Sequence, residues 1–337
     1  MAFNFNEHFE QMMQDNDVID VVILGHMNPD GDAAGSVMGL AHYIRNNYPQ
    51  YTAWPFLSEA LDKGPKKQVM KDAVFCPFER PKLNTERYAV IVCDTATLKR
   101  LVGMKYYQRA AVSMVIDHHA SNEGYGAINY IKISESCAYN VFEMLDREMM
   151  KKAAIASHPN AADYLYMGIL HDTDRFSRSD AGVEAAGSEL LEMGADHRYV
   201  MQTMQSKTLD DLLRQSELLR RVKREMDGRV AYIYMTYEEA NKLGIVYEDI
   251  HPVSGILRDC EDIQMGFSMY EEEPDVWRCS FRSDGQWINV NEMMQSFGGG
   301  GHAAAAGLRR KTHEPEKLLA AILEEIRKRV KNVDIQD

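Results

Sequence analysis

The chain has 337 residues, a hydrophobic fraction of 45% and a net charge of −13. This length suffices for two ordinary domains, each with its own core. The negative charge argues against a protein that grips long nucleic acid through many phosphate contacts, because such binding needs a positive surface. Residues 1–17 are polar and acidic, and no apolar run approaches the ~20 residues of a membrane span. We therefore expect a cytoplasmic protein.

Strand-like and helix-like segments alternate in the first half of the chain. Residues 21–24, 88–93 and 112–116 are apolar runs rich in β-branched residues, and residues 33–46 are typical of a helix. Such runs with helices between them indicate a parallel sheet covered on both faces. Parallel sheets bind ligands at the carboxyl ends of their strands. An α/β domain with a site at this edge of its sheet is therefore predicted.

The second half of the chain suggests another domain. From residue 161 onward, helices are predicted at 161–170, 183–193, 209–226 and 318–330, and strands at 230–234 and 277–281. The charge-rich helix at 209–226 would connect two domains. We place a catalytic domain at residues 1–195, a helical linker at 196–227 and a smaller α/β domain at 228–337.

Histidines and aspartates follow the predicted strands: His26, Asp30, Asp32, Asp94, Asp117, His118 and His119. Asp172 follows the predicted helix at 161–170. Carboxylate oxygens and imidazole nitrogens suit manganese and related divalent ions. Each motif also has a structural alternative. Residues 26–32 contain ordinary turn residues, and an aspartate such as Asp94 or Asp172 can cap a helix or turn.

The run Asp117-His118-His119 is the least typical of a turn. Three such residues after a buried strand are costly to desolvate without a function. Together with the other polar residues they supply enough ligands for two cations. Paired ions ~3.5–4 Å apart clamp the attacking and leaving oxygens of a phosphoryl displacement. A metal-dependent phosphoesterase is therefore predicted. The five cysteines form no Cys-x-x-Cys pair, so no thiolate zinc site is expected.

A glycine-rich segment, residues 298–301, leads into His302 and four alanines. Consecutive glycines let backbone amides approach an anion, and a following helix would add its N-terminal dipole. The alternative is a flexible linker. Arg282, at the end of a predicted strand, is a candidate anion clamp, with an exposed arginine as the alternative. The predicted phosphate-binding residues are Gly299, Gly300, Gly301, His302 and Arg282.

The order of these motifs resembles the DHH phosphoesterase superfamily, and the glycine–histidine segment resembles its C-terminal associated domain. The resemblance runs from about residue 18 to the end of the chain. The two-domain length is similar to the branch that degrades very short RNA and dephosphorylates 3′-phosphoadenosine 5′-phosphate. The resemblance implies a parallel-sheet domain with helices on both faces, a smaller α/β domain, and an active site in the cleft between them.

The resemblance also implies a role for each site residue. One manganese would be held by His26, Asp30 and Asp94, and the other by Asp32, Asp94, His118 and Asp172. Asp94 would bridge the two ions, with Mg²⁺ or Co²⁺ as alternatives to Mn²⁺. Asp117 would orient His118, and His119 would lie near the scissile phosphate. The glycines, His302 and Arg282 would bind the rest of the substrate.

One segment departs from the family pattern. Where this branch commonly has Thr-Asp-Thr-Gly, the chain has His171-Asp172-Thr173-Asp174. The ligand position is kept as Asp172. Asp174 adds bulk and negative charge where a glycine is usual, and this puts the substrate preference in doubt.

The expected function is that of a manganese-dependent hydrolase of oligoribonucleotides a few nucleotides long, of 3′-phosphoadenosine 5′-phosphate, or of both. The products would be 5′-mononucleotides and AMP. The alternatives are a phosphodiesterase of linear or cyclic dinucleotide signals, an exopolyphosphatase, and a nucleotide-binding sensor without catalysis. Neither a membrane nor long duplex nucleic acid is expected as a partner. The oligomeric state is left open, with a homodimer among the options.

Overall fold

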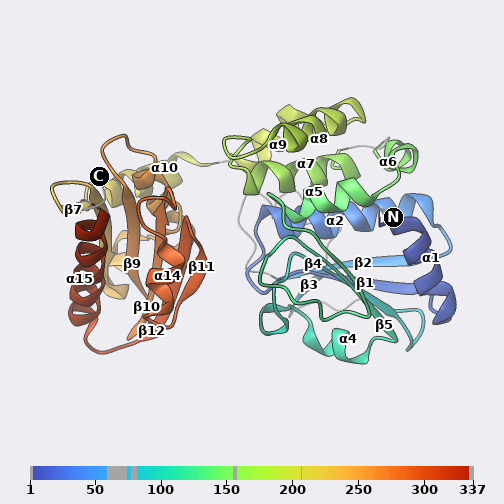
Figure 1. The fold of residues 1–337 in the computed structure, drawn as a ribbon, viewed down its shortest axis with the longest axis horizontal. Coiled ribbons are helices and arrows are strands. Elements are labelled where there is room, and N and C mark those ends of the chain that lie inside the picture. The colour runs from blue at the N-terminus through green and yellow to red at the C-terminus, as the bar shows by residue number, and fades with distance from the viewer. Residues whose placement is uncertain (1–2, 59–73, 77–81, 155–157, 206, 334–337) are drawn as a thin grey trace. The chain divides into compact units, whose positions relative to one another are not determined.

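The computed structural model describes residues 3–58, 74–76, 82–154, 158–205 and 207–333. The chain divides into two compact units, residues 1–206 and residues 207–337, and each is described by itself (Figure 1). Within the described residues, no helix is long and apolar enough to cross a membrane.

The described residues of the first unit form six strands and the helices that cover them. The strands are β1 (Asp20–Leu24), β2 (Thr52–Ser58), β3 (Val74–Cys76), β4 (Ala89–Cys93), β5 (Val112–Asp117) and β6 (Ile128–Ile131). The helices are α1 (Phe5–Asp15), α2 (Gly31–Asn47), the 3-10 helix η1 (Leu98–Arg100), α4 (Met104–Arg109), α5 (Cys137–Met144), α6 (Arg147–Ala153), α7 (Ala161–Asp172), α8 (Ala181–Glu192) and α9 (His197–Met204).

All neighbouring strands of the first sheet run parallel, in the order β3-β2-β1-β4-β5-β6. The chain moves outward from β1 to β2 and β3, and then returns to the other side of β1 as β4. The boundary between β1 and β4 is therefore a topological switch point, where open α/β sheets bind ligands beyond the carboxyl ends of their strands.

Side chains that alternate along the central strands enter two different cores. In β1, Val21 and Ile23 join the core beneath α2, α5 and α7, while Val22 and Leu24 join the core of η1 and α4. Figure 1 shows α2, α5 and α7 on one side of the sheet and α4 on the other. Burial on both faces explains the continuous apolar runs. The predicted parallel α/β architecture is confirmed.

The second unit is built on a mixed sheet. Its strands are β7 (Lys223–Glu225), β8 (Val230–Met235), β9 (Met265–Glu273), β10 (Val276–Ser283), β11 (Gly300–His302) and β12 (Ala305–Lys311). Its helices are α10 (Leu209–Leu219), α11 (Tyr237–Leu243), α12 (Tyr247–Ile250), α13 (Val253–Arg258), α14 (Val290–Gln295) and α15 (Pro315–Val333).

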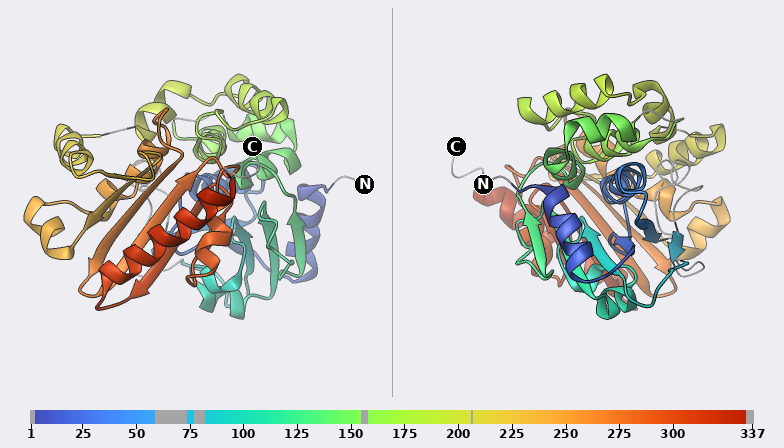
Figure 2. Two further views of the ribbon diagram at one scale, coloured as in Figure 1. Left: turned by 60° about the vertical axis from the view of Figure 1, so that its left-hand side comes forward. Right: turned by 90° about the vertical axis from the view of Figure 1, so that its right-hand side faces the viewer.

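The strands of the second sheet lie in the order β11-β12-β10-β9-β8-β7. Only β8 and β9 pair in parallel among the described strands of this sheet. One face packs on α14 and α15, and Figure 2 shows α15 lying along the strands. The other face packs on α10 to α13. This unit is the second, smaller α/β domain that the sequence predicts.

The predicted helix at residues 209–226 is shorter in the structure. It ends at Leu219, and residues 223–225 form strand β7, because they pair with β8 across a tight turn. The predicted linker at 196–227 thus contains a helix of each unit, with α9 packed against α7 and α10 against α12.

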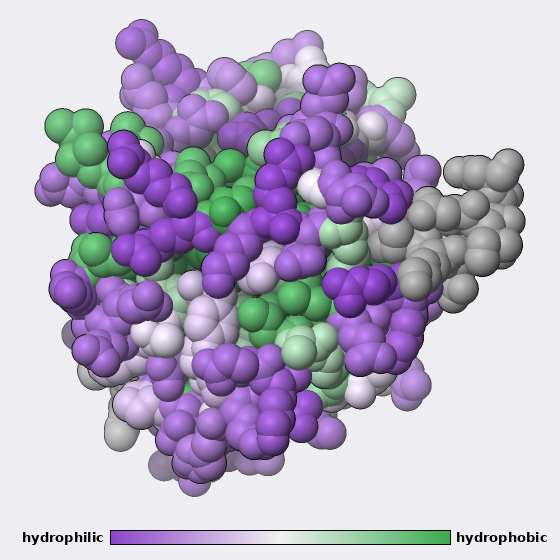
Figure 3. All heavy atoms as spheres, turned by 90° about the vertical axis from the view of Figure 1, so that its left-hand side faces the viewer, coloured by the Kyte–Doolittle hydropathy of each residue, from purple (hydrophilic) through white to green (hydrophobic). Residues whose placement is uncertain are grey.

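Helix α10 is only lightly buried in its own unit. Leu218 is its single buried residue, and four other leucines are exposed: Leu209, Leu212, Leu213 and Leu219. Figure 3 shows the face that lies on the left in Figure 1, where apolar side chains gather between hydrophilic ones.

Candidate metal centre

Apart from Asp172, the predicted site residues of the first unit lie at or just after the carboxyl ends of β1, β4 and β5. Asp94 directly follows β4, and Asp117 is the last residue of β5. His26 follows β1 and forms an isolated antiparallel β-bridge with Leu101. Helix α2 begins a few residues later. Asp30 caps this helix, accepting the amides of Asp32 and Ala33 at 3.0 Å each. The switch point of the sheet therefore carries the candidate site.

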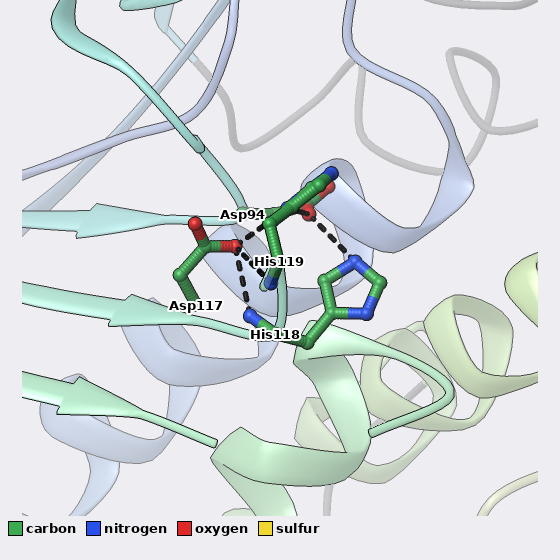
Figure 4. A group of neighbouring side chains, drawn as sticks. All are labelled: Asp94, Asp117, His118 and His119. Atoms are coloured by element: carbon green, nitrogen blue, oxygen red, sulfur yellow. Dashed lines mark hydrogen bonds and ion pairs between the residues drawn. The ribbon is translucent and has the colours of Figure 1, made fainter. Parts of the chain in front are cut away.

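Asp94 lies at the centre of this group (Figure 4). Its Oδ2 is 3.5 Å from Nε2 of His26, and its Oδ1 is 3.3 Å from Nε2 of His118. Its backbone takes the left-handed conformation, with φ at 51°, while its amide donates to the carbonyl of Ile116. Oδ1 of Asp94 and Nδ1 of His26 are buried without a hydrogen bond of good geometry among the described residues. Two such atoms in one site call for a ligand.

Asp32 is fully buried in the first turn of α2. Its carboxylate accepts hydrogen bonds from the backbone amides of Cys137 and Ala138, at 2.6 and 2.8 Å. These two residues begin helix α5. The N-terminus of a helix favours an anion. The same carboxylate lies 3.9 Å from Nε2 of His118. Asp32 is thus held rigidly with one oxygen near the imidazole.

Asp172 is the last residue of helix α7 and also lies near His118. Its Oδ2 is 3.7 Å from Nε2 of His118. The ring of His118 is fixed from behind, because its Nδ1 lies 3.0 Å from the carbonyl of Ser134. A carbonyl only accepts, so the proton of the neutral ring is on Nδ1, and the lone pair of Nε2 faces the carboxylates. This is the tautomer that a metal ligand needs.

Asp117 contacts the backbone of His118 and the side chain of His119, and its predicted role stays a prediction. Its Oδ1 accepts the backbone amide of His118 at 2.8 Å and Nδ1 of His119 at 2.8 Å (Figure 4). Its Oδ2 accepts the side-chain amide of Asn122 at 2.6 Å. The carbonyl of Ser134, not Asp117, contacts the ring of His118. Asp117 therefore holds the ring of His119 and the turn that follows β5. A carboxylate at the start of a turn commonly accepts hydrogen bonds from the next amides of the chain.

The structure brings the predicted ligands together in two groups of three. His26, Asp30 and Asp94 form one, and Asp32, His118 and Asp172 form the other; within each group the ligand atoms lie within 4.8 Å of one another. Asp94 belongs to the first group and approaches His118 of the second. Oxygen and imidazole donors suit Mn²⁺, Co²⁺ and related ions.

Charge gives a further reason to place cations here. Among the described residues, no lysine or arginine forms an ion pair with Asp30, Asp32, Asp94, Asp117 or Asp172. Burying carboxylates without positive partners is costly. The donor set therefore fits divalent cations, which would offset this charge.

The protonation of the metal-free site reflects the same excess of negative charge. Burial acts to lower the pKa of His118, but Asp94, Asp32 and Asp172 raise it to about 11. Burial, with Asp172 and Asp94 nearby, raises the pKa of Asp32 well above its usual range. Burial also acts to raise the pKa of Asp94, yet the imidazoles of His118 and His26 hold it well below that range. Protons thus occupy the positions that cations would take.

Asp174, which replaces the usual glycine, has a left-handed backbone with φ at 47°. Arg175 and Phe176 follow with φ at 60° and 67°. The carboxylate of Asp174 pairs with Nη2 of Arg175 at 2.7 Å, which offsets part of the added charge. Each left-handed residue that is not glycine costs on the order of 1–3 kcal/mol of folding free energy, and it persists only when the surrounding structure enforces it. Phe176 supplies that support, because it packs so close to Gly187 that a Cβ there would lie 2.4 Å from its ring.

Several supporting groups have no clear signal in the sequence. Asn122, the carbonyl of Ser134 and the first amides of α5 contact the site only through the tertiary fold. His171 lies beside Asp172 and Asp30. It could have been singled out, since it stands next to a predicted ligand and departs from the family pattern.

In the second unit, the glycine–histidine segment forms a hairpin. Residues 300–302 are strand β11, which pairs antiparallel with β12, so a strand follows His302 where a helix was expected. A Cβ at Gly299 or Gly301 would lie 2.3 Å from a backbone carbonyl. Their amides donate to the carbonyl of Met294 and to Oδ1 of Asn291. These two glycines therefore serve close strand pairing, and substrate binding by this segment stays a prediction.

Arg282 lies on β10, on the face that carries Arg278 and opposite the core residue Phe281. Its Nη1 donates to the carbonyl of Phe281 at 3.0 Å, and no carboxylate among the described residues pairs with it. Burial, with Arg258 nearby, lowers the pKa of the guanidinium. A half-buried guanidinium without an acidic partner suits an anionic ligand.

The sequence matches two known domain families. Residues 20–169 match the DHH family, N-terminal domain, and residues 227–332 match the DHHA1 domain. The first match contains every predicted ligand except Asp172, and the second contains Arg282 and the glycine–histidine segment.

Three similar proteins cover nearly the whole chain. A Bacillus subtilis (strain 168) protein named bifunctional oligoribonuclease and PAP phosphatase NrnA is 26% identical, over 86% of this chain and 88% of its own. A Mycoplasma pneumoniae protein of the same name is 27% identical, over 85% and 86%. The crystal structure of an exopolyphosphatase-related protein from Bacteroides fragilis has a TM-score of 0.79 and 21% identity, over 97% and 95%, and shares the fold.

Proposed function

Since the chain joins a DHH family N-terminal domain to a DHHA1 domain, we propose that it is a two-cation phosphoesterase. It hydrolyses oligoribonucleotides of a few nucleotides to 5′-mononucleotides, and 3′-phosphoadenosine 5′-phosphate to AMP. The observation that carries this proposal is Asp94, a buried carboxylate that belongs to one group of candidate ligands and lies 3.3 Å from His118 of the other. Two relatives that span most of the chain are named for these two activities.

Two groups of residues would hold the cations. His26, Asp30 and Asp94 bind one, and Asp32, Asp94, His118 and Asp172 bind the other. Bound divalent cations would supply a water of lowered pKa and would neutralise charge on the phosphoryl oxygens. Mn²⁺ is the ion we propose, with Mg²⁺ and Co²⁺ as alternatives, because the donors are carboxylates and imidazoles.

The protein's own residues set the geometry around these ions. The carbonyl of Ser134 accepts from Nδ1 of His118, so that Nε2 faces the carboxylates and would be free to bind a cation once its proton is displaced. Asp117 holds the ring of His119 through Nδ1, and we place this ring against the scissile phosphate. Fixed donors of this kind stabilise developing charge without reorganisation. Arg282 and His302 of the second unit would bind the remaining phosphates of the substrate.

The proposed substrates fit a cytoplasmic enzyme that acts on short, single-stranded partners. The net charge of −13 disfavours long duplex nucleic acid. We therefore expect no stable complex with duplex DNA or RNA, and a homodimer stays one of the assembly options.

A substrate panel tests the function. The purified chain is assayed with Mn²⁺, Mg²⁺ or Co²⁺ against a diribonucleotide, 3′-phosphoadenosine 5′-phosphate, a cyclic dinucleotide and polyphosphate. We expect turnover of the first two, with Mn²⁺ most effective. Turnover of polyphosphate or the cyclic dinucleotide alone would replace the proposal with one of those activities. Nucleotide binding without turnover under any of the ions would indicate a sensor.

A further inference from the structure

His171 lies directly beside the proposed ligand Asp172, at the end of α7. Its Nδ1 is 3.2 Å from Oδ1 of Asp172. An ionised carboxylate only accepts hydrogen bonds, so the imidazole is the donor and its proton lies on Nδ1. The side chains of His171 and Asp172 are 30% and 24% exposed, so this edge of the site faces solvent.

The backbone of α2 holds His171 in place. A Cβ at Gly31 would lie 2.7 Å from Cβ, Cγ and Cδ2 of His171, closer than real Cβ contacts come. Gly31 stands between the proposed ligands Asp30 and Asp32, at the first position of the helix. Its φ is not in the left-handed region, so space for the ring, and not backbone conformation, accounts for the glycine.

The two oxygens of Asp172 face different partners. Oδ1 meets Nδ1 of His171, while Oδ2 lies 3.7 Å from Nε2 of His118. His171, Asp30 and Asp172 bring their polar atoms within 4.8 Å of one another. The imidazole therefore links the end of α7 to the start of α2, the two elements that carry three of the proposed ligands.

We propose that His171 is a positioning residue that holds Oδ1 of Asp172, so that Oδ2 points to the cation shared with Asp32 and His118. This inference rests on the proposed function. Hydrogen-bonded partners of metal ligands set ligand orientation, and their loss typically weakens metal affinity roughly 10–100-fold.

Metal binding gives the direct test, because it needs no turnover. Mn²⁺ is titrated by isothermal calorimetry into the wild-type protein and into His171→Ala, His171→Asn and His171→Gln. We expect His171→Ala to weaken one Mn²⁺ affinity roughly 10–100-fold. Asparagine should restore most of it, because its amide nitrogen occupies about the position of Nδ1. Recovery by glutamine but not by asparagine would overturn the proposal, since it would mark Nε2 as the working atom.

A matched control lies at the other end of α7. Nδ1 of His158 is 2.6 Å from Oδ2 of Asp163, another imidazole–carboxylate pair, and its histidine is similarly exposed at 38%. His158→Ala should leave Mn²⁺ affinity unchanged. An equal loss in His158→Ala and His171→Ala would mean that the effect is general destabilisation, and would contradict a positioning role.

A double-mutant cycle tests the link to Gly31. Gly31→Ala should weaken Mn²⁺ binding in the wild type, because its methyl group displaces the ring of His171. The same change should cost little more in a His171→Gly background, which lacks the Cβ that a Gly31 methyl group would also meet at 2.7 Å. Fully additive losses would contradict the link. If wild-type protein binds no Mn²⁺ and cleaves no substrate, the proposed function fails; if it does both and His171→Ala matches it, only this inference fails.

Discussion

The metal centre of the first unit and the glycine-rich hairpin of the second are both predicted from short motifs, but their residues are used in opposite ways. At the metal centre, buried polar atoms such as Oδ1 of Asp94 lack good hydrogen bonds. In the hairpin, the amides of Gly299 and Gly301 already donate within the unit. A motif of ionisable side chains thus predicts chemistry, whereas a motif of glycines predicts how closely backbones approach.

The largest effect is expected at Asp94. Asp94→Ala removes the carboxylate shared by both ligand groups, so kcat should fall by at least about 10³-fold, which corresponds to several kcal/mol of lost charge stabilisation. Steady-state hydrolysis of a diribonucleotide measures it. Asp20 is the control, since it is buried at the amino end of β1, away from the site edge. The Asp20→Asn variant should keep the Mn²⁺ affinity and the activity of the wild type. If it lost as much activity as Asp94→Ala, the site could not be assigned to the carboxyl edge of the sheet alone.

Arg282 should affect the substrate and not the ions. Loss of a charged hydrogen bond of about 1.5–3 kcal/mol should raise KM roughly 10–100-fold in Arg282→Ala. Mn²⁺ affinity should stay at the wild-type value, as calorimetry would report. Arg278 lies on the same face of β10 but pairs with Glu272 at 3.1 Å, so Arg278→Ala should change KM less. Lost Mn²⁺ binding in Arg282→Ala would contradict the separate roles of the two units.

The glycines of the hairpin should differ from one another in stability. Gly299→Ala forces a Cβ to 2.3 Å from the carbonyl of Gly307, and should cost about 1–3 kcal/mol of unfolding free energy. At Gly300 the nearest atom would be 3.7 Å away, so Gly300→Ala is the matched control and should be tolerated. Urea unfolding followed by circular dichroism compares them. Equal stability of the two variants would show that close strand pairing is not what requires Gly299.

A further expected effect is a pH dependence of the metal-free protein. The raised pKa of His118, about 11, means that its stabilising contribution is complete below about 6.5 and is lost as pH rises toward 11. The raised pKa values of Asp32 and Asp172 act in the same direction. Stability in EDTA should therefore fall between pH 6.5 and 8.5, by up to about 1.4 kcal/mol per pH unit for one group.

Saturating Mn²⁺ should remove most of this dependence, because cations replace the protons and bind more tightly as pH rises. Thermal unfolding across this pH range, in EDTA and in Mn²⁺, makes the comparison. The variant His118→Gln should flatten the slope in EDTA. A Tm that rises with pH in EDTA would contradict the assigned direction of the His118 shift.

The central strands were predictable because both of their faces are buried. β1 and β4 are buried at every residue, which produces continuous apolar runs. The outer strands could not be predicted in this way. β6 is only partly buried, and β2 contains Pro55 and is half-buried at Thr52, Trp54 and Ser58. Strands at or near the edge of a sheet lack the uniform apolar environment that allows a strand to be recognised from a single sequence.

The sequence by itself determined which residue types reach the site and where along the chain they occur, because parallel strands deliver their carboxyl ends to one edge. Only the tertiary structure decided the partners. The ring of His118 is held by the carbonyl of Ser134 and not by Asp117, and the ring of His171 packs against Gly31 of α2. Hydrogen bonds have a reach of about 3 Å, so the pairings depend on how α2, α5 and α7 pack, and one chain's residue order does not specify those distances.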